Sequence, residues 1–149
     1  MDERSALVVI DMQGGFLSPG CPEAIGETMP DCFGPERGDY VLFKPRFSAF
    51  FQTEPDLMLR RLRRDTVLLA GTTTPNCIRT TAYDGLSLEY NVAVLSDCTS
   101  SINDDVQRAN LEDMARVGVQ ILSSEDFLSG RVTLDDCAGR VQAAVKAGV

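Results

Sequence analysis

Residues 66–77 have the sequence TVLLAGTTTPNC, and this stretch indicates an α/β fold. Its first six residues form a continuous apolar run, which is typical of a strand that is covered on both faces of a sheet. Thr74 is a good helix N-cap, and Pro75 is favoured at the first helical position. The stretch therefore predicts a buried strand that passes directly into a helix over residues 75–88, with Cys77 in the first turn of that helix.

Apolar runs and helical patterns continue to alternate on both sides of this stretch. Strands are recognised by short β-rich runs, and helices by apolar residues at intervals of three and four. We expect further strands at residues 5–10, 40–43, 91–96 and 119–123, and helices at residues 54–64, 103–116, 123–129 and 133–147. Such alternation predicts an open α/β sandwich with a mainly parallel sheet and right-handed crossovers.

Residues 18–39 interrupt this alternation. They contain four prolines and four glycines, which break any helical or strand periodicity. Ordinary winding would place a helix here, so the sheet is expected to be shortened between its first and second strands. The whole chain, residues 1–149, is expected to form one domain with 18–39 as an irregular segment.

The composition argues against several classes of function. The net charge of −8 leaves no positive surplus for nucleic-acid binding. The sequence has no histidine, which rules out a Ser-His or Cys-His dyad and a histidine-based metal site. No stretch approaches the ~18–20 apolar residues of a membrane span, and the start of the chain does not resemble a signal peptide. We therefore expect a cytoplasmic protein whose five cysteines need no pairing.

Three chemically active residues, Asp11, Lys44 and Cys77, follow predicted strands, and the carboxyl ends of neighbouring parallel strands meet at one edge of a sheet. A helix N-terminus favours the thiolate of Cys77. Without histidine, Asp11 is the natural general base, and Lys44 would stabilise the negative charge. Each residue also has a structural alternative. Cys77 could be a packing residue, Lys44 a solvated strand end and Asp11 a turn residue.

Other catalytic motifs are missing from the sequence. It contains no GxGxxG, no GxxxxGK[ST] and no GxSxG. Tyr83 stands six residues after Cys77, where a phosphatase-type phosphate loop would need arginine. We interpret Asp97, Asp104 and Asp105 as helix-capping residues rather than catalytic ones.

Four stretches resemble the isochorismatase-like cysteine hydrolases: ALVVIDMQGGF (6–16), FKPRFSAFFQT (43–53), TVLLAGTTTPNCIRTTAYDGLSLEYNVAVLSDCTSS (66–101) and VQILSSEDF (119–127). The combination of D-M-Q-x-x-F, K-x-R-x-S-A-F and G-x-x-T-x-x-C is specific, although each motif alone would be weak. The resemblance implies a Rossmann-like three-layer α/β/α sandwich with a mainly parallel sheet. It also implies that Asp11, Lys44 and Cys77 are catalytic.

The same resemblance implies finer features of the site. A cis peptide bond is expected between Thr72 and Thr73, and the N–H groups of Thr73 and Cys77 would form an oxyanion hole. Gln13 and Phe16 match positions that line the substrate pocket or support the aspartate. Nicotinamidase-type members hold a metal with an aspartate and two histidines. Because this sequence has no histidine, we expect neither a metal nor a cofactor.

The family resemblance leads to a primary functional hypothesis and two alternatives. The first is hydrolysis of a non-peptide C–N bond in a small amide, carbamoyl or ureido compound, through a cysteine thioester. The second is a non-catalytic binding or oligomerisation protein on a truncated hydrolase fold. Vinyl-ether cleavage, which does not need the cysteine, is a third. The expected partners are a small amide-type substrate and further copies of the chain, with no nucleic acid and no membrane.

Overall fold

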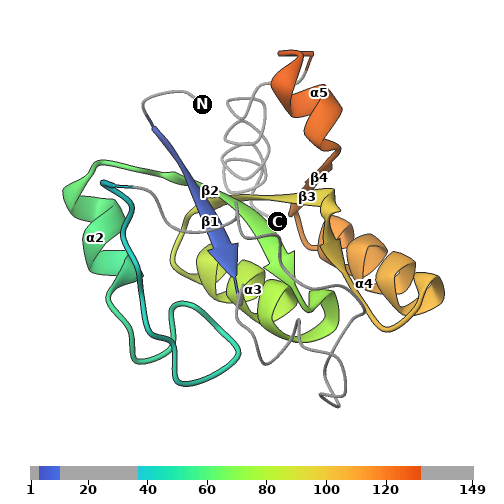
Figure 1. The fold of residues 1–149 in the computed structure, drawn as a ribbon, viewed down its shortest axis with the longest axis horizontal. Coiled ribbons are helices and arrows are strands. Elements are labelled where there is room, and N and C mark those ends of the chain that lie inside the picture. Colours follow the sequence, from blue (N-terminus) through green and yellow to red (C-terminus); the bar gives the residue numbers. More distant parts are fainter. Residues whose placement is uncertain (1–3, 11–36, 132–149) are drawn as a thin grey trace, which may run out of the picture.

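The computed structural model describes residues 4–10 and 37–131, which form a parallel four-stranded sheet with flanking helices (Figure 1). The strands lie in chain order: β1 (Ser5–Ile10), β2 (Thr66–Thr72), β3 (Asn91–Ser100) and β4 (Gln120–Leu122). The helical elements are α2 (Pro55–Arg61), the π-helical turn η1 (Thr74–Ile78), α3 (Arg79–Ser87), α4 (Asp104–Arg116) and α5 (Ser124–Leu128). The predicted parallel α/β fold is confirmed. The expected helix over 133–147 lies outside the described residues, as do residues 18–36 of the irregular segment.

The strands direct alternate side chains into two apolar layers, one on each face of the sheet. Val67 and Leu69 of β2 belong to the larger core, whereas Leu68 belongs to the smaller one. Helices α2, α3 and α4 each contribute a buried side chain to the larger core. These side chains are Leu59, Ala82 and Met114, respectively. Phe127 of α5 packs against the smaller core. Helices therefore cover both faces, as the sandwich prediction requires.

The ends of β1 and β2 approach each other unusually closely. Ile10 is the register partner of Gly71, and a Cβ atom at Gly71 would collide with the backbone of Ile10. Gly71 also has a φ of +115°, a conformation that residues with a side chain rarely adopt. Glycine is thus required where β2 leaves the sheet, next to the point at which Asp11 follows β1 in the chain.

The strand predicted at residues 40–43 is wrong. These residues are irregular and exposed, and the described sheet pairs β1 directly with β2. A run such as YVLF has a high β-propensity, but a strand also needs a neighbour for its backbone N–H and C=O groups. Here the residues are exposed, within a connection that lies on the left of the view in Figure 1.

Helices α4 and α5 begin where the sequence predicts helices over residues 103–116 and 123–129. The side chain of Asn103 accepts a hydrogen bond from the N–H of Val106, with Asp104 and Asp105 in the first turn of α4. Ser123 accepts one from the N–H of Asp126 in α5.

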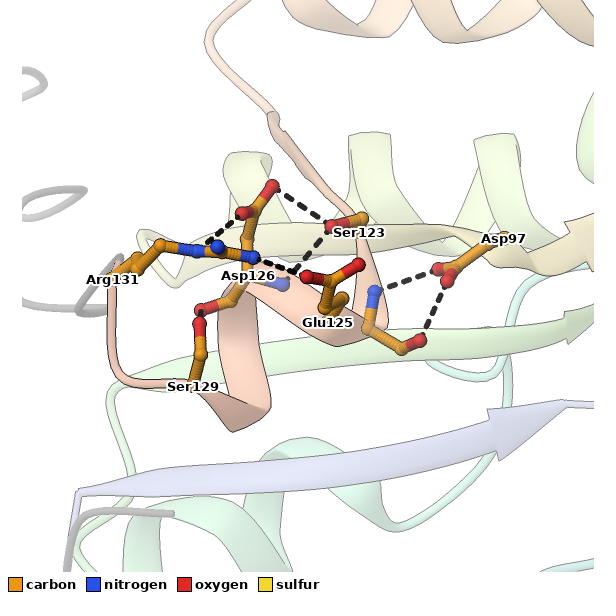
Figure 2. A network of polar contacts seen from close by, with 7 residues as sticks. Asp97, Ser123, Glu125, Asp126, Ser129 and Arg131 are labelled. Atoms are coloured by element: carbon orange, nitrogen blue, oxygen red, sulfur yellow. Dashed lines mark hydrogen bonds and ion pairs between the residues drawn. The ribbon is translucent and has the colours of Figure 1, made fainter.

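A polar network fixes α5 against the end of β3 (Figure 2). Asp97 accepts hydrogen bonds from the N–H and the hydroxyl of Ser124, at 2.8 and 2.6 Å, and these bonds lower the pKa of its carboxyl. Arg131 pairs with Glu125 and Asp126 on the same helix. Asp97 therefore binds the first N–H group of α5, in agreement with its predicted role as a helix-capping residue.

Candidate active site

The site is built on the turn that follows β2. The peptide bond between Thr72 and Thr73 is cis, at the position where the family resemblance implies one. The carbonyl of Thr73 then accepts hydrogen bonds from the N–H groups of Asn76 and Ile78, each at 3.2 Å, and the bond from Ile78 makes this turn π-helical. Helices η1 and α3 continue one into the other from this point.

Thr74 does not cap the helix, contrary to the prediction. The helix already begins at Thr74, so Thr73 occupies the N-cap position without a side-chain capping bond. The hydroxyl of Thr74 instead donates to the carbonyl of Ser100 at the end of β3, at 3.0 Å. Thr74 is fully buried, and its hydroxyl ties the turn to the neighbouring strand. Cys77 therefore stands at the fourth helical position rather than the third, still close to the helix start.

Cys77 and Lys44 are brought together although they are 33 residues apart in the chain. Cys77 is only 3% exposed, and the Nζ atom of Lys44 lies 3.6 Å from its Sγ atom. The lysine is half-buried, and Nζ also donates to the carbonyl of Arg46 at 2.9 Å. An ammonium group in this position stabilises a thiolate by Coulomb attraction. The pair can thus supply an activated sulfur nucleophile.

Lys44 reaches Cys77 from an irregular segment rather than from a strand end. The segment is fastened to α3 by Ala49, whose N–H donates to the hydroxyl of Thr81 at 2.9 Å. Ser48 and Thr81 are both almost completely buried at this contact. Thr81 lies four residues after Cys77, so both side chains project from the same face of the helix. The helix predicted over residues 75–88 includes Thr81, but the sequence pattern does not reveal this positioning contact.

Three of the predicted site residues, Asp11, Gln13 and Phe16, lie outside the described residues. Ile10, the residue before Asp11, pairs with Gly71 at the end of β2. The roles of all three therefore stay predictions.

Cys98 is the second cysteine in the described part of the chain, and its surroundings differ from those of Cys77. The residue is exposed near the end of β3, and partial desolvation of its thiol together with the charge of Asp97 raises the pKa of Cys98. A raised pKa disfavours the thiolate, so Cys98 lacks the surroundings of a nucleophile.

Within residues 4–10 and 37–131, no group of three or more histidine, cysteine, aspartate or glutamate side chains is arranged to hold a metal ion. The helices found in those ranges are also too short or too polar to cross a membrane.

Comparisons with known proteins agree with the fold. Residues 22–126 match the model of the isochorismatase domain, so the chain belongs to the isochorismatase family. The structure superposes on an isochorismatase family protein of Desulfovibrio vulgaris with a TM-score of 0.78 and 28% identity, over 86% of this chain and 98% of the other. A cysteine hydrolase of Pseudomonas syringae gives a TM-score of 0.78 over 91% and 94%, and at 20% identity it supports the fold alone.

One curated relative is named as an amidohydrolase, and the name of another includes the word inactive. The maleamate amidohydrolase of Pseudomonas putida is 33% identical over 126 residues, covering 84% of this chain and 55% of the relative. An Arabidopsis thaliana protein named "Probable inactive nicotinamidase" is 41% identical over 86 residues, covering 57% and 44%. The chain spans about half the length of the curated relatives it matches.

Proposed function

We propose that this chain is a cysteine amidohydrolase that cleaves a non-peptide C–N bond in a small amide, carbamoyl or ureido compound. The observation that carries the proposal is the contact between Lys44 and the buried sulfur of Cys77 at the start of a helix. Relatives named as amidohydrolases for maleamate and ureidoacrylate support this class of substrate.

The reaction begins with formation of a thioester. Asp11 accepts the proton of the Cys77 thiol, and Lys44 stabilises the resulting thiolate. The sulfur bonds to the carbonyl carbon of the substrate, and the N–H groups of Thr73 and Cys77 stabilise the negative oxygen. The C–N bond breaks as Asp11 returns the proton to the nitrogen, which releases ammonia or an amine.

Water then regenerates the enzyme. Asp11 accepts a proton from water, the water oxygen bonds to the thioester carbon, and the C–S bond breaks. The proton returns to Cys77, and the acid product leaves. Gln13 and Phe16 are proposed to line the pocket that positions the substrate carbonyl for both steps.

Ammonia release from a panel of small amides and ureido acids tests the proposal. The wild-type chain should turn over at least one compound, Cys77→Ser should lose this activity, and Cys98→Ser should keep it. Iodoacetamide labelling followed by peptide mapping provides a test that needs no substrate. If the wild-type chain neither releases ammonia nor reacts selectively at Cys77, it is not a cysteine hydrolase.

A further inference from the structure

The segment that carries Lys44 presents an unusual amount of apolar surface. Tyr40 is 66% exposed, Val41 75% and Phe43 95%, and further exposed apolar side chains follow at Phe47 and Phe51. An aromatic side chain carries about 150–250 Å² of surface, so this segment exposes on the order of 600–800 Å² of apolar area. That is more than the ~300–600 Å² of the largest apolar patch on a typical monomer.

A groove lies directly beside this apolar segment. It has a volume of about 310 Å³, and two elements form its walls. The lining residues are Arg46, Phe47, Ser48 and Phe51 of the segment and Thr80 and Asp84 of α3. The groove therefore combines two phenyl rings with one basic and one acidic side chain, and these two opposite charges balance. Such a lining suits an aromatic side chain.

Phe43 does not fill the groove beside it. Only Lys44 and Pro45 separate it from Arg46, so the Cα atoms of Phe43 and Arg46 lie within about 11 Å of each other. Its 95% exposure nevertheless leaves the ring in solvent. A two-fold axis can pair such surfaces reciprocally, because each copy then inserts its protruding ring into the groove of the other copy.

We propose that this surface is the interface of a two-fold symmetric dimer, in which Phe43 of each copy occupies the groove of the partner. The apolar area of the segment approaches the about 800 Å² that each partner contributes to a standard-size interface. Phe43 and Arg46 flank Lys44, so the interface would also hold the segment that presents this lysine to Cys77.

Sedimentation velocity over a concentration series tests the proposal. Phe43→Ala removes the ring, and Thr80→Trp fills the groove of a chain whose Phe43 is intact. Each variant should raise the dissociation constant of the dimer at least about tenfold. Leu128→Glu is the matched control, because Leu128 is an 81% exposed apolar residue on α5, and it should leave the dimer unchanged. Thermal unfolding verifies that each variant is folded.

A mixture of the two interface variants makes the test specific. In a mixed dimer, Phe43 of the Thr80→Trp chain meets an intact groove, and the alanine of the other chain faces the groove that tryptophan fills. Native mass spectrometry should therefore detect more mixed dimers than either variant alone forms.

Three results would overturn the proposal. The wild-type chain could be monomeric at every concentration in the series. Leu128→Glu could weaken the dimer as much as the interface variants do, or neither interface variant could weaken it. A monomeric wild type with a melting temperature lowered by Phe43→Ala would indicate that residues of the same chain cover the ring.

Discussion

The hydroxyl of Thr81 accepts a hydrogen bond from the backbone N–H of Ala49 at 2.9 Å, between two buried residues. This bond connects the helix that carries Cys77 to the irregular segment that carries Lys44. The position of the lysine relative to the sulfur therefore depends on a contact that lies outside the proposed chemistry.

Replacing Thr81 by valine should destabilise the protein and weaken its activity. Valine keeps the shape of threonine but leaves the N–H of Ala49 buried without an acceptor, which costs about 1–3 kcal/mol. Urea unfolding measures this loss, and Thr81→Ser, which retains the hydroxyl, is the matched control. If the valine variant is as stable as the serine variant, the hydrogen bond does not fasten the segment.

Replacing Lys44 by methionine should slow the alkylation of Cys77 by iodoacetamide at neutral pH. A neighbouring positive charge favours the thiolate over the thiol, and only the thiolate reacts. Lys44→Arg keeps the positive charge, so the rate of Cys77 alkylation should fall much less in this variant. Cys98 in the same sample serves as an internal reference. Equal rates at Cys77 in wild type and Lys44→Met would contradict a role for the lysine.

The sequence predicted the elements that depend on local pattern. The buried runs of β2 and β3 and the starts of α4 and α5 follow from residue types within a few positions of one another. The juxtaposition of Lys44 and Cys77 was also predictable, although it was expected from a lysine at the end of a strand.

The features that the sequence pattern did not reveal depend on contacts between distant residues. The run at 40–43 has the composition of a strand, but only a paired neighbour makes it one. Thr74 has the chemistry of an N-cap, but its hydroxyl bonds to Ser100, 26 residues away. Thr81 lies in a predicted helix, and only the folded chain places the N–H of Ala49 against its hydroxyl.

Replacing Gly71 by alanine should strongly destabilise the protein. The added Cβ would collide with the backbone of Ile10, and the φ of +115° disfavours any L side chain. The backbone of a paired strand cannot move away as a flexible side chain can. We therefore expect the free energy of unfolding to fall by at least about 2 kcal/mol. Urea unfolding measures the effect. Gly118→Ala is the control, because Gly118 also has a positive φ but a Cβ atom added there would meet nothing within 4 Å.

The stability of the protein should fall at high pH because of Tyr90. Burial and the hydrogen bond from its hydroxyl to Asp56 raise the pKa of Tyr90 from 10.0 to about 12. The folded protein therefore binds this proton more tightly than the unfolded chain does. The stabilisation is complete below pH 10, declines as the unfolded tyrosine ionises, and is lost as the pH rises through about 12. Tyr90→Phe removes the titrating group, so the difference in unfolding free energy between wild type and this variant should be constant at neutral pH and shrink above pH 10. A difference that stays constant up to pH 12 would show that Tyr90 ionises alike in both states.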